Sequence, residues 1–175
     1  SNPHIYAVGD AIETICFFTG QKMQLTLAGP AQRQARAAAD HVYGRTYLNT
    51  GVIGSSSVKM YGLNSANTGL NEKQCQARGI AYDFAYIIPK DKVSIMPGAE
   101  NLFFKLIFAV PSGKILGAQA VGRGNVDKRI DVIATAIMLN ANLEDLKELE
   151  LTYSPHFSTA KDVVNHAVLV GLNIL

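Results

Sequence analysis

The chain has 175 residues and a net charge of +2, with 48% hydrophobic and 17% charged residues. That length suits one globular domain with a smaller attached piece, and the scattered Lys and Arg argue against a nucleic-acid or anionic-membrane partner. Because no apolar run reaches the roughly 18 to 20 residues that span a bilayer and no secretory signal pattern opens the chain, we expect a cytoplasmic protein.

The first motif is an apolar, strand-like run at residues 5–8 that ends in Gly9-Asp10. Gly9 allows a tight backbone turn. The carboxylate of Asp10 is then placed to accept a hydrogen bond from a ligand hydroxyl. The alternative is an ordinary aspartate that caps or stabilises a turn.

A helix is predicted from Pro30 through the alanine-rich residues 31–43, with Gly44 as its stop. Proline suits the first helical position because its missing N–H costs nothing there, and glycine commonly follows a helix end. The free N–H groups at the helix start carry a partial positive charge that favours a nearby anion. The many alanines predict that this helix packs closely on a neighbour.

From residue 51 onward the pattern changes to strands and amphipathic helices. The order of these elements predicts an α+β domain, in which an antiparallel sheet carries helices on one face. The charged run at 127–129 is predicted to lie on a solvated helix face. Strands are predicted at 55–60, 82–88, 102–110 and 114–121, a loop at 64–69, and helices at 71–79, 126–138, 142–149 and from 158 onward.

The Gly-Asp motif, followed by Ala11-Ile12-Glu13, resembles the second FAD-binding motif of the pyridine nucleotide-disulfide oxidoreductases. Later stretches resemble the dimerisation domain of the same family, most closely its coenzyme A-disulfide reductase and NADH oxidase branch. In that family the Gly-Asp motif comes late, whereas here it comes first. The resemblance therefore implies a C-terminal remnant of the FAD-binding domain at 1–48 and a dimerisation domain at 49–175. The later stretches that match are 65–72, 114–122 and 126–136.

For an intact enzyme, the resemblance implies bound FAD with NAD(P)H as co-substrate. Asp10 would then hold the ribityl chain, and the helix start would face the pyrimidine edge of the flavin. The G-x-G-x-x-G loop that binds a dinucleotide phosphate is missing from the sequence, so we expect the chain alone to bind no cofactor and to be inactive. The cofactor-binding residues implied in this way are Gly9, Asp10, Leu27, Ala28, Gly29 and Ala31.

The same resemblance implies that Tyr153 and His156 reach the active site of a partner subunit. Coenzyme A-disulfide reductases carry a tyrosine at the position of Tyr153, where its hydroxyl can donate to a thiolate or a substrate sulfur. His156 is the second candidate, two positions after the site of a His-Pro pair that glutathione-reductase relatives carry and this chain replaces with Ser154-Pro155. The alternatives are a tyrosine with its ring in the core and a hydrogen-bonded structural histidine.

One departure from the reductase pattern leaves the parent activity open. Residues 95–97, Ile-Met-Pro, stand where coenzyme A-disulfide reductases often have Tyr-Tyr-Pro, and Met-Pro there resembles the oxidase and peroxidase relatives. The parent enzyme would therefore act on a small-molecule disulfide, on peroxide or on oxygen. A free-standing dimeric binding or structural module is the alternative outside the enzymes.

We expect a homodimer whose interface includes the small-residue strand 115–121 and the helix from Val126, because apolar residues there would otherwise be exposed. The two cysteines and four histidines are too dispersed for a metal site. Cys75, within a short helix, is expected to be a buried small hydrophobe rather than a redox thiol.

Overall fold

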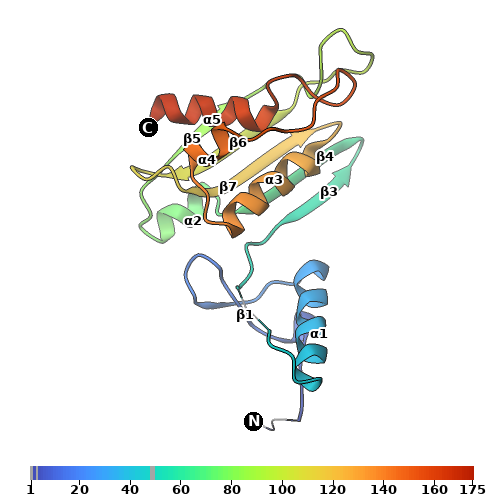
Figure 1. Cartoon of the computed structure of the whole chain (residues 1–175), viewed down its shortest axis with the longest axis vertical. Helices are drawn as coiled ribbons and strands as arrows, with labels where there is room; N and C mark the ends of the chain where they lie inside the picture. Colours follow the sequence, from blue (N-terminus) through green and yellow to red (C-terminus); the bar gives the residue numbers. More distant parts are fainter. Residues whose placement is uncertain (1, 3, 48–49) are drawn as a thin grey trace. The chain divides into compact units, whose positions relative to one another are not determined.

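The computed structural model describes residues 2, 4–47 and 50–175. They form two compact units, Ser1–Gly54 and Ser55–Leu175 (Figure 1). The predicted domain boundary between residues 48 and 49 lies outside the described residues.

The first unit consists of a short 3-10 turn, a two-stranded ribbon and one long helix. The turn η1 spans Gly9–Ala11, strands β1 (Thr14–Ile15) and β2 (Lys22–Met23) pair antiparallel, and helix α1 spans Ala28–Val42. The run at 5–8 is not a strand, because it pairs with no other described segment and an extended chain needs a partner to form a ladder.

Helix α1 starts two residues before the predicted position. The amide of Ala31 donates to the carbonyl of Leu27 at 3.2 Å, which makes Leu27 the N-cap and Pro30 the third helical residue. Proline is tolerated there because the first amides of a helix have no acceptor within it. The predicted stop is confirmed: Gly44 has a positive φ of 68° and donates to the carbonyl of His41 at 3.0 Å.

The second unit is built on a five-stranded antiparallel sheet in the order β3-β4-β7-β6-β5 (Figure 1). This confirms the predicted fold class. One strand was missed, because residues 64–69 are polar and small and predict a loop. They belong to β4, which becomes a strand because β3 pairs along one of its edges and β7 along the other. The strands are β3 Ser56–Met60, β4 Leu63–Gly69, β5 Tyr82–Ile87, β6 Phe103–Ala109 and β7 Ile115–Gly122.

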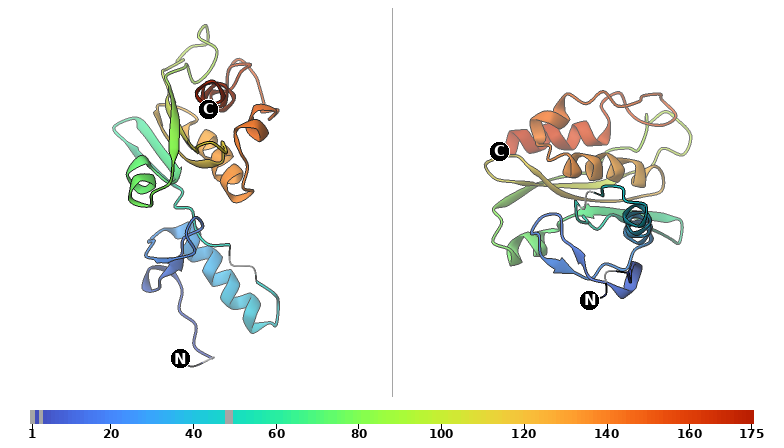
Figure 2. Two further views of the ribbon diagram at one scale, coloured as in Figure 1. Left: turned by 90° about the vertical axis from the view of Figure 1, so that its left-hand side faces the viewer. Right: turned by 60° about the horizontal axis from the view of Figure 1, so that its bottom comes forward.

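Helices cover one face of this sheet (Figure 2). Helix α3 (Val126–Met138) packs on β4 and β7, helix α5 (Val163–Ile174) packs on β5 and β6, and the short α4 (Leu143–Lys147) packs on α5. The remaining helix, α2 (Glu72–Ala77), lies within the predicted helix 71–79 and opens with a capping box on Asn71. Within the described residues no helix is long and apolar enough to cross a membrane.

The core lies between the sheet and these helices. Its largest fully buried side chains include Phe104, Leu106 and Phe108 of β6 and Ile133 and Ile137 of α3. The small residues of β7 serve a close backbone contact, since a Cβ on Gly117 would lie 2.1 Å from the carbonyl oxygen of Leu70.

Two expectations for this region are wrong. Residues 115–121 do not form a continuous exposed apolar patch, because β7 is the central strand and Ile115, Ala118 and Ala120 are buried in the core of the unit, which leaves Val121 as the exposed apolar side chain of this stretch. The charged run at 127–129 is not wholly solvated either. Arg129 is buried, because it falls on the apolar stripe of α3, three residues after Val126 and four before Ile133.

Candidate functional site

Gly9 lies directly against the first turns of α1. Its amide donates to Oε1 of Gln34 at 2.7 Å, and a Cβ on Gly9 would meet the Cβ of Ala31 at 3.7 Å. Its φ is +76°, a conformation that glycine adopts at little cost. Two of the predicted cofactor residues, Gly9 and Ala31, are therefore neighbours, although 22 positions separate them in the sequence.

Asp10 sits in η1 as an exposed carboxylate. Among the described residues its side chain makes no hydrogen bond or ion pair, and the N-cap of η1 is Val8, with no side-chain cap. A capping role for Asp10 therefore finds no support. An ionised carboxylate accepts hydrogen bonds only, so Asp10 can receive a donor such as a hydroxyl.

The start of α1 offers backbone donors without a competing carboxylate. Ala28 and Gly29 are its first two residues, Pro30 has no N–H, and the first turn contains no acidic residue. Gly29 has no positive φ, and nothing lies within 4 Å of the place a Cβ would take. Packing within the unit therefore does not require glycine at position 29. An anionic group that approaches the start of α1 would need the space that a larger side chain would fill.

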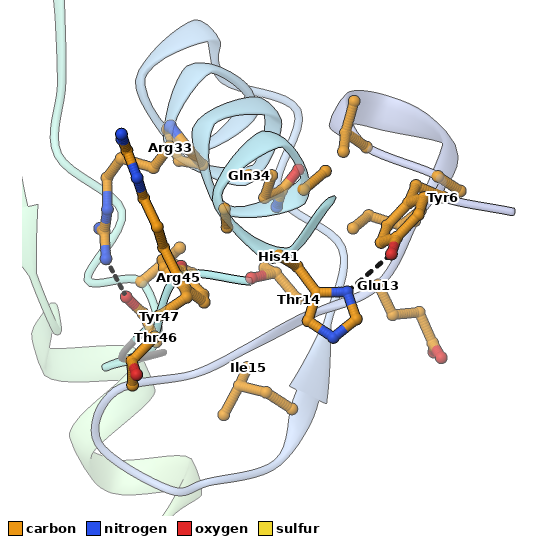
Figure 3. Close-up of a pocket in the computed structure, with 18 residues that line it drawn as sticks. Tyr6, Glu13, Thr14, Ile15, Arg33, Gln34, His41, Arg45, Thr46 and Tyr47 are labelled. Carbon is orange, nitrogen blue, oxygen red and sulfur yellow. Dashed lines mark hydrogen bonds between the residues drawn. The ribbon is translucent and has the colours of Figure 1, made fainter. Parts of the chain in front are cut away.

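A hollow of about 480 Å³ borders the junction of η1 and α1, with Val8, Pro30 and Gln34 among the residues that line it (Figure 3). The hydroxyl of Tyr6 and Nδ1 of His41 lie 2.6 Å apart across it, and Arg33 donates to the carbonyl of Gly51 at 3.3 Å. None of the six predicted cofactor residues lines it. These side chains were not singled out from the sequence, although Pro30, Gln34 and His41 recur at helical spacing on one face.

Tyr153 and His156 share the loop 148–162 between α4 and α5. Tyr153 is 51% exposed, so its ring is not a core residue, and His156 is exposed as well. Neither side chain has a hydrogen-bond partner among the described residues, so the alternative of a hydrogen-bonded structural histidine finds no support. The loop turns at Ser154, whose carbonyl accepts from the amides of Phe157 (2.9 Å) and Ser158 (3.1 Å). Both side chains are free to meet a ligand or another protein surface.

The cysteines and the possible metal ligands are weaker candidates for a functional site. Cys16 and Cys75 are both buried, and burial raises the pKa of the Cys75 thiol, an effect that the charge of Arg78 opposes and that of Glu72 reinforces. Over the described part of the chain, no group of three or more His, Cys, Asp or Glu side chains could hold a metal ion.

Residues 55–164 match the sequence family described as "Pyridine nucleotide-disulphide oxidoreductase, dimerisation domain". The chain belongs to this family. The match includes Tyr153 and His156. It begins at residue 55, where the second compact unit also begins.

Individual relatives extend the similarity to the first unit. The coenzyme A disulfide reductase of Staphylococcus epidermidis is 33% identical over 93% of this chain and 37% of its own length. The NADH oxidase of Methanocaldococcus jannaschii is 30% identical over 95% of this chain and 37% of its own. The crystal structure of reduced Bacillus anthracis CoADR-RHD is 46% identical, with a TM-score of 0.94 over 98% of this chain and 31% of that one. The chain thus spans about a third of the length of these relatives.

Proposed function

We propose that this chain is the C-terminal portion of an FAD-dependent NAD(P)H disulfide oxidoreductase, in which it supplies the dimer interface and completes the active site of the partner subunit. The observation that carries this proposal is the similarity to coenzyme A disulfide reductases, which covers 93% of the chain but only 37% of the relative. Residues 1–48 would be the end of the FAD-binding domain, and residues 49–175 would be the dimerisation domain. Alone, the chain would be inactive.

The residues at the η1–α1 junction fit a flavin. Asp10 would accept a hydrogen bond from the ribityl chain, and the amides at Ala28 and Gly29 would face the anionic edge of the ring. Leu27, Gly9 and Ala31 would shape the same surface. When bound, FAD would carry electrons from NAD(P)H to the final acceptor. The adjacency of Gly9 and Ala31 and the open space at Gly29 support this assignment.

Tyr153 and His156 would act on the acceptor side of the reaction. The Tyr153 hydroxyl would donate a hydrogen bond to a thiolate or to substrate sulfur, and His156 would supply or remove a proton there. Their exposure and their unengaged polar atoms support a role towards a partner subunit.

The acceptor that we favour is coenzyme A disulfide, because of the 33% and 46% identities to a coenzyme A disulfide reductase and to CoADR-RHD. Oxygen or peroxide is the second candidate. It is favoured by the side chains of residues 95–97, Ile-Met-Pro, which offer no second hydroxyl, and by the similarity to an NADH oxidase.

A homodimer is also proposed, since the family is defined by a dimerisation domain. Large apolar side chains are uncovered on the sheet face opposite the helices, and no residue of α1 is buried despite its alanines. Both features support further protein contacts.

The test is to purify two proteins, the complete product of the gene that contains this sequence and the 175-residue chain alone. The complete protein should be yellow and dimeric, and it should oxidise NAD(P)H with coenzyme A disulfide faster than with oxygen or peroxide. The isolated chain should be colourless and inactive. A complete product that binds no flavin, or that contains only this chain and still forms a stable dimer, would favour the free-standing binding module instead.

A further inference from the structure

Arg129 is a charged side chain inside the core of the second unit. It projects from α3, and its side chain is only 6% exposed. A buried charge is costly unless it is paired and hydrogen-bonded. Here Nη2 of Arg129 lies 3.0 Å from Oδ2 of Asp162 in a buried ion pair. Asp91 and Ser158 are buried as well, so the pair belongs to a polar cluster within a largely apolar core, and its presence calls for a reason other than stability alone.

The guanidinium also donates to backbone carbonyls of two separate loops. Nη2 donates to the carbonyl of Asp91 at 3.1 Å and to that of Phe157 at 3.3 Å, while Nη1 donates to the carbonyl of Asn125 at 3.1 Å. Asp91 lies in the loop 88–102 between β5 and β6, and Phe157 lies in the loop 148–162 between α4 and α5. The two loops lie at the same end of the unit (Figure 1). One side chain therefore joins two loops that are far apart in the sequence.

The carboxylates near Arg129 each fix their own loop as well. Oδ1 of Asp91 accepts from the amide of Glu100 at 2.9 Å, which closes the loop 88–102. Oδ1 of Asp162 accepts from the amide of Val164 at 3.0 Å and caps α5. Arg129 thus binds at the point where each loop is already anchored.

The turn between β7 and α3 adds a second connection to both loops. Nδ2 of Asn125 donates to the carbonyl of Phe157 at 3.3 Å, and Asn125 has a positive φ of 55°. A Cβ on Gly124 would lie 3.1 Å from Oδ2 of Asp91. This turn therefore packs closely on the loop 88–102 while Asn125 holds the loop 148–162.

We infer that Arg129 is a positioning residue. It fixes the loop 148–162, which carries Tyr153 and His156, against the loop 88–102, which carries residues 95–97. Both loops would then reach the active site of the partner subunit in one fixed orientation relative to each other. The inference rests on the proposed function, which gives Tyr153 its role. Because the side chains of Tyr153 and His156 make no hydrogen bonds among the described residues, their positions depend on the loop backbone, and that backbone is held by Arg129 at Phe157 and Asp162. Only a planar group with several donors can reach all of these acceptors together.

The first test uses the chain itself, with amide hydrogen exchange in Arg129→Lys. Lysine keeps the charge beside Asp162 but cannot span both carbonyls. Amides of both loops should exchange about tenfold faster, whereas those of the turn 110–113 should not change. Lys128→Met, an exposed neighbour on the same helix, is the matched control and should leave both loops unchanged. Faster exchange in only one loop, or in neither, overturns the inference.

A milder variant keeps this test decisive if Arg129→Lys does not fold. Asp162→Asn removes the charge that pairs with Arg129 over 3.0 Å and keeps a side-chain oxygen that can accept from the amide of Val164 at the start of α5. Exchange should then accelerate in the loop 148–162, which ends at Asp162, and remain unchanged in the loop 88–102, which Arg129 still holds at Asp91. Unchanged exchange in the loop 148–162 contradicts the inference.

The second test uses the complete flavoenzyme. Arg129→Lys should lower kcat with the acceptor about tenfold through loss of orientation, while the rate of flavin reduction by NAD(P)H stays at the level of the unmodified enzyme. A purely structural role would lower both rates or neither. If the complete protein lacks NAD(P)H-dependent activity, the proposed function fails and the exchange results still decide whether Arg129 couples the loops. If activity is present and kcat is unaffected by Arg129→Lys, the positioning role fails.

Discussion

The amide of Gly9 donates to Oε1 of Gln34 over 2.7 Å, which ties the first motif of the chain to the second turn of α1. This bond brings the Gly-Asp turn to the start of the helix without any strand pairing for residues 5–8. The carboxylate of Asp10 is left exposed beside that junction. The local geometry of the proposed flavin site is therefore set by contacts within these residues.

Gly9→Ala should destabilise the first unit. Space for the methyl group exists, since it would meet Ala31 Cβ at 3.7 Å, but the positive φ of Gly9 costs an alanine about 1–2 kcal/mol. Gly29→Ala is the matched control: its φ is ordinary and its surroundings are open, so alanine should stabilise the helix by about 0.5–1 kcal/mol. Urea unfolding measures the stability of each variant, and amide hydrogen exchange in α1 reports on the first unit. Equal stability of the two variants would contradict the importance of the turn.

Asp10→Ala should weaken FAD binding in the complete protein. Loss of a hydrogen bond to a charged group costs about 1.5–3 kcal/mol, which would appear as a lower flavin content after dialysis. Asp40→Ala is the control, because Asp40 is a carboxylate of the same unit near the other end of α1, where it pairs with Arg45 at 3.7 Å. If both variants retain the same flavin content, Asp10 does not bind the cofactor.

Local signals in the sequence predicted the elements whose stability is itself local. The side chain of Asn142 accepts from the amides of Glu144 and Asp145, so the cap of α4 depends on only three neighbouring residues. Strand β4 could not be predicted in this way. Its polar residues 64–69 form a strand only because β3 and β7, one of them more than 45 residues away in sequence, pair with both edges.

The same distinction applies to the candidate site. Gly9 and Asp10 are adjacent in the sequence, so a short motif could single them out. The structure leaves the Asp10 carboxylate exposed, and its role as an acceptor for a ligand stays a prediction. Arg129 was missed because its neighbours Asp127 and Lys128 suggest a solvated face, while its partners Asp91 and Asp162 lie more than 30 positions away. Its place on the apolar stripe of α3 was the one signal available in the sequence.

Cys75 should make the chain less stable at alkaline pH. Burial raises the pKa of this thiol in the folded state above its ordinary value of 9.0. Above that pH the unfolded chain has lost the proton while the folded chain still holds it, so the free energy of unfolding falls as pH rises towards the higher, folded pKa. Urea unfolding from about pH 7 to about pH 10 should show a steeper loss for the unmodified chain than for Cys75→Ala. Parallel curves would show that Cys75 does not titrate differently on folding.

Association should depend on the open face of the sheet. Val58, Ser65, Val121 and Phe103 stand opposite one another across β3, β4, β7 and β6, and Val58 and Val121 are 58% and 37% exposed in the single chain. If this row is covered in the dimer, Val58→Lys with Val121→Lys would bury two unpaired charges. The dimer dissociation constant should then rise at least about tenfold, or ~1.4 kcal/mol, in sedimentation equilibrium.

Lys128→Glu provides the control for that experiment, because it changes the charge of an exposed residue on the helix side of the sheet. It should leave the dimer intact. Thermal unfolding of each variant shows whether the fold survives, which it should, since both valines already contact solvent. A dimer that tolerates two lysines on β3 and β7 would mean that the open sheet face is not the interface, and attention would move to the exposed side of the helices and to the loop of Tyr153.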